Sequence, residues 1–116
     1  MNIQIYYAKK NPDVLKAERF FKERSIPYQL VDLYKHKPGR KEMGIFVRAV
    51  GAKALVDRQG KKSLERAVAH MTIDSLIIEE LLCDPTAMIS PVVRNGQHAT
   101  CGVDEMCWRS WLDTKM

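Results

Sequence analysis

The residues best suited to chemistry lie where an apolar segment, residues 3–8, turns into a helix that begins near Asp13. The turn reads Lys-Lys-Asn-Pro at positions 9–12. The unpaired N–H groups and the dipole of such a helix start can stabilise a thiolate or bind an anion. This turn contains no sulfur, because Asn11 stands in it where a reactive thiol could act. The residues therefore predict either an anion site flanked by two lysines or an asparagine helix cap beside two solvated lysines.

Three cysteines are the other candidate nucleophiles: Cys83, Cys101 and Cys107. None forms a Cys-x-x-Cys pair, and their spacing is not that of zinc ligands, so no metal site is predicted. Cys83 follows two leucines at a predicted helix end and is interpreted as a small core residue. Three cysteines cannot all pair internally, so we expect reduced thiols in a reducing compartment. The histidines are scattered and predict no catalytic triad: His36, His70 and His98.

The composition predicts one soluble domain of 116 residues, 46% of them hydrophobic. No apolar run approaches the roughly 20 residues of a membrane span, and the N-terminus lacks a signal-peptide layout, so the expected location is the cytoplasm. The net charge of +5 raises the question of nucleic-acid binding. The basic residues are spread, with no aromatic interleaving and no helix-turn-helix or zinc-finger pattern. The sequence therefore favours a solvated basic surface, an acidic protein partner or an anionic ligand over nucleic acid. Arg48 and Arg58 are candidates for a guanidinium fork to such a partner.

Strands and helices alternate in the part of the chain that must position the turn. A strand over 3–8, a helix from Asp13 and a second strand over 28–33 predict a parallel strand pair joined by a right-handed crossover. The apolar positions of this helix predict one buried stripe: Val14, Leu15, Ala17, Phe20 and Phe21.

A helical block is expected next, followed by a hairpin and a final helix. The predicted helices of the block cover three ranges: 40–50, 61–70 and 73–83. Asn95-Gly96 stands between the extended runs 87–93 and 97–101 and predicts a hairpin. Asp104 is expected to cap the last helix, which offers these apolar positions to the sheet: Met106, Cys107, Trp108, Trp111 and Leu112.

The order of elements and three stretches of sequence resemble the ArsC/Spx family of thioredoxin-like proteins. The stretches are 12–21, with Lys-Ala before a Phe-Phe pair; 46–60, with a helix, Gly51 and a second glycine turn; and 81–105, with Asp-Pro, Ser-Pro-Val-Val and Gly-Val-Asp-Glu. The family includes glutaredoxin-linked arsenate reductases and the Spx regulators that bind RNA polymerase. The resemblance implies an α/β, thioredoxin-like domain over 1–116, built on a four-stranded mixed sheet. It places a helical insertion, about 38–84, between the strand-helix-strand unit and the C-terminal hairpin plus helix.

The resemblance also places the family's reactive positions on this sequence, and most of the residues differ. The nucleophilic cysteine falls on Asn11, the second cysteine of the redox-switch version on Val14, and the oxyanion-holding arginine on Ser90. Asparagine cannot attack arsenate or form a mixed disulfide, because a thiolate is the required nucleophile. Pro91 matches the family's proline, which is typically cis and sets backbone groups beside the reactive turn. A rigid start of a strand, with no functional role, is the other interpretation of Pro91.

The leading hypothesis is therefore a non-catalytic, redox-inactive ArsC/Spx-like protein that binds an acidic protein or an anion through the basic face around this turn. The predicted binding residues are Lys9, Lys10, Asn11, Pro12, Arg48, Ser90 and Pro91. In the Spx-like version, the partner would be an RNA polymerase subunit. The alternative is an arsenate reductase-like oxidoreductase that depends on glutathione and glutaredoxin. It would need an unexpected nucleophile, since Cys101 and Cys107 are expected to lie away from the turn. No metal and no membrane association are expected, and glutathione is the one cofactor considered.

Overall fold

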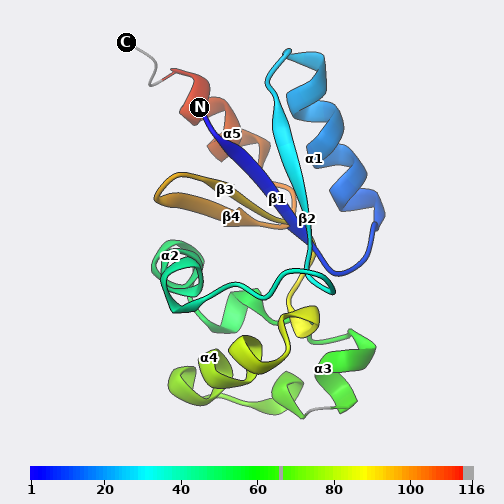
Figure 1. Ribbon diagram of the computed structural model, residues 1–116, viewed down its shortest axis with the longest axis vertical. Coiled ribbons are helices and arrows are strands. Elements are labelled where there is room, and N and C mark those ends of the chain that lie inside the picture. Colours follow the sequence, from blue (N-terminus) through cyan, green and yellow to red (C-terminus); the bar gives the residue numbers. More distant parts are fainter. Residues whose placement is uncertain (66, 114–116) are drawn as a thin grey trace.

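A four-stranded mixed sheet in the order β2-β1-β3-β4 forms the centre of the molecule (Figure 1). The structure is a computed structural model that describes residues 1–65 and 67–113. β1 runs parallel to β2 and antiparallel to β3, which pairs antiparallel with β4. The strand bounds are β1 Ile3–Tyr7, β2 Tyr28–Asp32, β3 Val92–Asn95 and β4 His98–Cys101. The predicted mixed sheet and hairpin are confirmed.

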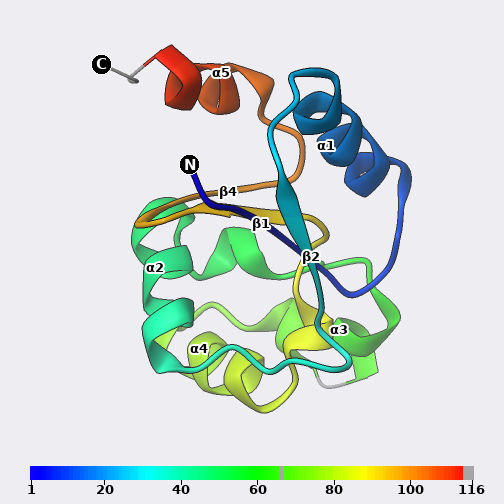
Figure 2. The same ribbon diagram turned by 45° about the horizontal axis from the view of Figure 1, so that its top comes forward.

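Helices cover both faces of the sheet (Figure 2). One face carries α1 (Pro12–Glu23), the crossover from β1 to β2, and α5 (Glu105–Asp113), which follows β4. The other face carries the insertion between β2 and β3. Its helices are α2 (Arg40–Val50), α3 (Lys61–Glu65) and α4 (Asp74–Cys83), joined by short 3-10 turns at Lys53–Leu55, Val68–His70 and Pro85–Ala87. In the described part of the chain, no helix has the length and apolar character needed to cross a membrane.

The alternation of side chains along the strands divides the core into two layers. Ile3 and Ile5 face α1 and α5, where Trp108 is fully buried between them and the helices. Tyr6 and Val92 face the insertion and belong to the second layer. The Trp108 indole donates a hydrogen bond to Thr100 Oγ1 at 2.8 Å, so its one polar group is satisfied inside the core. We conclude that both tryptophans of α5 pack in the core, since Trp111 is also buried.

Three apolar or sulfur side chains expected in the core lie at the surface instead. Leu15 is 56% exposed, because the buried stripe of α1 runs through its neighbour Val14 and the positions three to seven residues further along. Met106 is 84% exposed for the same reason, since it precedes the stripe of α5 that carries the tryptophans. Cys83 is exposed at the end of α4, so its interpretation as a core residue is wrong.

The insertion departs from the predicted elements at two points. The single helix predicted over 61–70 is wrong, because α3 ends at Glu65 and Ala67 takes a left-handed conformation with φ of 64°. Residue 66 lies outside the described residues. The extended run predicted over 87–93 becomes a strand of the sheet only at Val92. The segment before it pairs with the insertion instead: Ile89 N–H donates to Leu55 O at 2.7 Å, and Met88 forms an isolated bridge with Val56.

Candidate functional site

The turn between β1 and α1 is closed by a helix cap. Asn11 precedes the first helical residue, and its Oδ1 accepts a hydrogen bond from Val14 N at 2.9 Å. Pro12 follows at the first helical position, where its missing N–H costs nothing, and Asp13 places a carboxylate near the positive end of the helix. The capping interpretation of Asn11 is confirmed.

The other half of the Asn11 side chain ties the turn to the chain before β3. Asn11 Nδ2 donates to the Ser90 carbonyl oxygen at 2.9 Å, across 79 residues of sequence. Ser90 Oγ in turn accepts from Ala8 N at 2.8 Å and lies 3.4 Å from Lys9 N. The Ser90 side chain is only 3% exposed, and the Ser90–Pro91 peptide bond is cis, as the resemblance implied. We call this arrangement the Asn11–Ser90 latch.

The polar groups of the latch are already bonded within the protein. Both polar atoms of the Asn11 amide are used, one by the helix and one by Ser90. A serine hydroxyl becomes a nucleophile only beside a general base. Among the described residues, no histidine or carboxylate is hydrogen-bonded to Ser90 Oγ, which meets only backbone N–H groups. The corner therefore acts as a structural joint between β1, α1 and the start of β3.

The two lysines of the turn lie at the rim of this corner. Each forms an ion pair in which the lysine side chain is the more exposed member. Lys9 Nζ lies 3.4 Å from Asp57 Oδ2, and Lys10 Nζ lies 3.6 Å from Glu18 Oε2. Lys10 also lies over the Tyr7 ring, 5.8 Å from its centroid. The Lys9–Asp57 pair is exposed at its lysine end and contributes at most about 1 kcal/mol, so Lys9 can exchange Asp57 for another anion. Glu18 Oε2, by contrast, is buried and accepts no hydrogen bond from the described residues, so Lys10 is its counter-ion.

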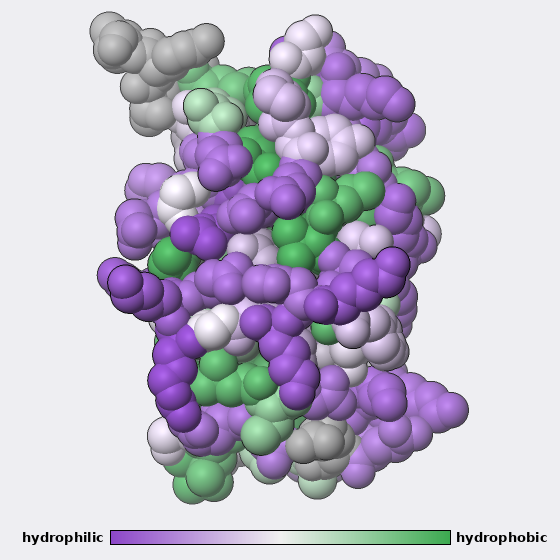
Figure 3. All heavy atoms as spheres, viewed as in Figure 1, coloured by the Kyte–Doolittle hydropathy of each residue, from purple (hydrophilic) through white to green (hydrophobic). Residues whose placement is uncertain are grey.

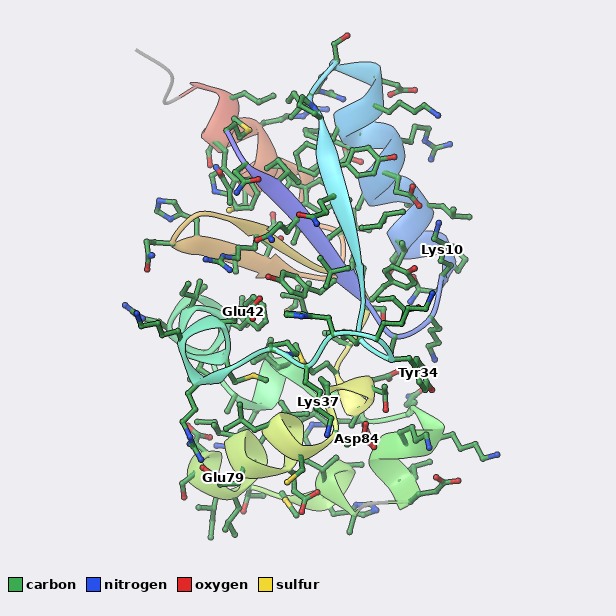
Figure 4. The ribbon with its side chains drawn as sticks, viewed as in Figure 1. Lys10, Tyr34, Lys37, Glu42, Glu79 and Asp84 are labelled. Atoms are coloured by element: carbon green, nitrogen blue, oxygen red, sulfur yellow. The ribbon has the colours of Figure 1, made fainter. Side chains whose placement is uncertain are left out.

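A small hollow next to Lys9 adds two lysines that the sequence did not single out. It measures about 130 Å³ and lies between the end of β1, the loop after β2 and the start of α3. Its polar lining is Lys9, Tyr34, Asp57, Lys61, Lys62 and Thr86. Within residues 1–65 and 67–113, neither Lys61 nor Lys62 has an ion pair. Figure 4 shows Tyr34 and Lys10 on the side of the molecule where α1 begins. We call this the lysine hollow.

Both arginines proposed for a guanidinium fork lie elsewhere. Arg48 lines a different hollow, with Gln97 and His98 at the turn of the hairpin, which is the opposite end of β3 from Ser90 and Pro91. Arg58 Nη1 donates to the Ala69 carbonyl oxygen and so braces the insertion. The structure thus gathers Lys9, Lys10, Asn11, Pro12, Ser90 and Pro91 at one corner and leaves Arg48 apart.

The environments of Cys101 and Cys107 disfavour their thiolates. Cys101 packs with the core on the insertion side of the sheet, whereas Asn11 starts the helix that covers the other side. Burial raises the pKa of the Cys101 and Cys107 thiols, and the nearby Asp104 carboxylate raises both further. Raised pKa values disfavour the thiolate that thiol chemistry requires. In the described residues, no group of three or more His, Cys, Asp or Glu side chains is arranged to hold a metal ion.

Solved structures with the same architecture are proteins related to arsenate reductase. An ArsC-family-related protein from Bacteroides fragilis is 17% identical with a TM-score of 0.78, over 95% of this chain and 98% of that one. An ArsC-related protein from Brucella melitensis is 19% identical with a TM-score of 0.67, over 100% and 97%. An arsenate reductase from Vibrio cholerae is 16% identical with a TM-score of 0.73, over 88% and 90%. No protein-family model matches the sequence, and no curated protein does.

These likenesses establish the class of fold. The chain has the thioredoxin-like α/β fold of ArsC-related proteins, with the helical insertion between β2 and β3, as the sequence predicts. At these identities the likeness defines the architecture, and function has to be argued from the site.

Proposed function

We propose that this chain is a non-catalytic ArsC/Spx-like protein that binds an acidic protein partner through the basic face around the start of α1. The observation that carries the proposal is the Asn11–Ser90 latch. The positions of the family's nucleophile and oxyanion-binding arginine hold two side chains that bond to each other's segments and to the backbone. The polar groups of Asn11 and Ser90 therefore hold the two segments together. The groups that remain available to a partner are the lysines at the rim of the corner.

The size and charge of the lysine hollow favour a protein over a free cofactor. Small-molecule pockets typically measure about 300–1,000 Å³. A hollow of about 130 Å³ accommodates one carboxylate or one oxyanion and is too small for glutathione. Lys9, Lys61 and Lys62 would attract a carboxylate there, and the net charge of +5 would steer an acidic surface toward the protein. An aspartate or glutamate on a partner surface is the occupant that this hollow fits best.

A charge-swap experiment tests the binding face. The probe is a fluorescent deca-glutamate peptide, and its anisotropy is measured with the wild type and with a Lys61→Gln/Lys62→Gln variant. The matched control is Lys16→Gln/Lys22→Gln, which removes the same charge from exposed positions of α1. We expect the first variant to weaken binding about fivefold or more and the control less than about twofold, at an ionic strength near 0.05 M where exposed charges are weakly screened. Equal losses of affinity in both variants would show that binding depends only on the net charge of the protein, and would contradict the proposal. Co-elution with purified RNA polymerase, compared across the same variants, tests the Spx-like version.

A separate assay tests the absence of catalysis. Arsenate reduction coupled to glutathione and glutaredoxin is measured for the wild type and for the Cys83→Ser/Cys101→Ser/Cys107→Ser variant. We expect neither to exceed the rate without protein, because no activated thiol lies at the corner. Turnover by the wild type that disappears in the cysteine-free variant would establish the reductase alternative instead.

A further inference from the structure

A larger hollow lies on the other side of the sheet from α1, above the part of the insertion face that the helices leave open. It measures about 500 Å³, within the range of small-molecule sites. Its lining comes from β1, β2, the loop after β2 and the first turn of α2, and includes Gln4, Tyr6, Gln29, Asp32, Lys35, His36 and Glu42. Hydrophilic side chains dominate the middle of this face (Figure 3). We call it the sheet-face hollow.

The strand register explains why this part of the face is open. Gln29, Gln4 and Arg94 are cross-strand neighbours and form one row of side chains across β2, β1 and β3. Two residues further along, Val31, Tyr6 and Val92 form the next row. The insertion packs on this second row, which belongs to its core layer. The first row is polar, so it gives the insertion no apolar surface to cover.

A rigid network of ionisable groups forms the floor of the hollow. Tyr6 Oη donates to Glu42 Oε2 at 2.7 Å and lies 3.4 Å from Arg94 Nη1. Glu42 Oε1 lies 3.1 Å from His36 Nε2. Figure 4 shows Glu42 between α2 and the strands. Burial opposes ionisation of Glu42, but hydrogen bonds from Tyr6, His36 and a backbone N–H outweigh it and keep the pKa of the carboxyl below its usual value. The Glu42 carboxylate is therefore ionised near neutral pH.

The groups that this network leaves unused are mainly hydrogen-bond donors. Among the described residues, the side-chain NH₂ groups of Gln4 and Gln29 have no hydrogen-bond partner, and the Lys35 ammonium has no ion pair. The lining also contains two carboxylates. Both oxygens of Glu42 already accept hydrogen bonds, and Asp32 Oδ1 accepts one from Tyr34 N at 2.9 Å. A ligand that complements two amide donors and an ammonium carries acceptor oxygens and a negative charge.

We propose that the sheet-face hollow binds a small organic carboxylate, held by the side-chain amides of Gln4 and Gln29 and by the Lys35 ammonium. The site is distinct from the lysine hollow, because the two share no lining residue. The carboxylate lies across the polar row, above the hydrogen-bonded Tyr6 and Glu42 side chains. The ligand is a molecule of a few to about twenty heavy atoms, as the volume of the hollow allows.

Amide-detected NMR of the full chain tests the proposal, with sodium succinate and sodium glutamate as probes. Sodium phosphate is the comparison anion, and sodium chloride at matched ionic strength is the control for salt. We expect saturable shifts of amide signals in β1, β2 and the loop after β2, with a dissociation constant on the order of 1 mM for at least one carboxylate. Saturable shifts with phosphate alone, or no saturable shift with any probe, would overturn the proposal.

Two variants locate the site. Gln4→Leu removes one amide donor and is expected to weaken the binding about tenfold. Gln29→Ala changes an exposed edge position, so it keeps the test available if Gln4→Leu fails to fold. The matched control is Lys16→Gln/Lys22→Gln, which changes exposed positions of α1 outside both hollows and is expected to leave carboxylate binding unchanged. Loss of the shifts in a Lys61→Gln/Lys62→Gln variant, with no effect of either glutamine variant, would assign the carboxylate to the lysine hollow and contradict a second site.

Discussion

Two polar regions of this molecule differ in what they leave unused. At the corner between β1 and α1, the Asn11 amide and the Ser90 hydroxyl and carbonyl are all bonded to protein groups. On the sheet face, Tyr6 and Glu42 bond to each other, but the amide nitrogens of Gln4 and Gln29 above them have no hydrogen-bond partner among the described residues. The first region uses its polar groups to join β1, α1 and the start of β3. The second region has amide donors that are available to a ligand.

The corner between β1 and α1 has a defined geometry with no thiol in it. The cap, the cis Ser90–Pro91 bond and the approach of the two segments are all present without a thiol. What keeps them together is a set of hydrogen bonds whose partners are buried or half-buried. Substitution of a residue that only holds the fold should lower the free energy of unfolding. Substitution of a residue that only binds a ligand should lower the affinity for that ligand. That contrast can be measured.

The largest expected effect is the loss of the latch. Asn11→Ala removes a helix cap, which costs about 0.5–2 kcal/mol. Ser90→Ala leaves the Ala8 N–H without its partner, which costs about 1–3 kcal/mol for a buried donor. Because the two residues are in contact, their effects are not strictly additive, and we expect the double variant to lose about 2–4 kcal/mol of unfolding free energy in urea.

The matched control for this prediction is the pair Gln4→Ala and Gln29→Ala on the sheet face. Their amide nitrogens have no hydrogen-bond partners among the described residues, so each should cost less than about 1 kcal/mol. If the sheet-face variants destabilise the protein as much as the latch variants, the two regions do not differ as described.

The second prediction concerns the floor of the sheet-face hollow at high pH. Burial first, and then the hydrogen bond to Glu42, raise the pKa of Tyr6 to about 12. The unfolded value is about 10, so the protonated phenol stabilises the fold below about pH 10. This stabilisation is lost as the pH rises from about 10 to about 12. We expect the urea midpoint of the wild type to fall over this range more steeply than that of Tyr6→Phe, which has no phenol to ionise. Parallel profiles would show that the Tyr6 hydroxyl ionises as it does in water.

The third prediction restores a thiol to the corner. Asn11→Cys, in a background in which all three native cysteines are serine, places sulfur at the N-cap of α1. The helix start should lower the pKa of this thiol. We expect alkylation by iodoacetamide at pH 7 to run about tenfold faster than for a single-cysteine variant that keeps only Cys101, whose pKa is raised by burial. Mass spectrometry follows the reaction. Slow alkylation of Asn11→Cys would show that the start of α1 does not lower the pKa of a thiol at this position.

Much of the fold could be predicted from the sequence, because its signals are local. The cap at Asn11, the Asn95-Gly96 hairpin and the cap at Asp104 each depend on residues within a few positions of each other. The prediction that Leu15 is buried is wrong. Val14 and Leu15 are both apolar, and only tertiary packing decides which of the two faces the sheet.

The sites depend on contacts that no local pattern contains. The hydrogen bond between Asn11 and Ser90 spans 79 residues and requires the register of β1 on β3. The sequence resemblance placed both residues at reactive positions, but it could not show that they bond to each other's segments. Lys61 and Lys62 reach the corner through the packing of the insertion, and Gln4 joins Gln29 through the pairing of β1 with β2. In the sequence, the lysine hollow is indicated only by the turn that ends at Gly60, directly before the two lysines. A Cβ at Gly60 would lie 2.7 Å from Asp57 Oδ2, so a larger residue there would displace the Asp57 side chain that lines the hollow.

The smallest expected effect separates the rim of the corner from the latch beneath it. Lys9→Gln breaks one ion pair, with Asp57, whose lysine end is exposed. Pairs of this exposure contribute about 0.2–1 kcal/mol, and the lost contact is partly replaced by water and salt. We expect this variant to change the unfolding free energy by less than about 0.5 kcal/mol at 0.15 M salt, while weakening the deca-glutamate interaction. A loss of stability comparable to that of Asn11→Ala, with no change in peptide binding, would make Lys9 part of the structural joint. That outcome would contradict the proposal that the basic face binds an acidic partner.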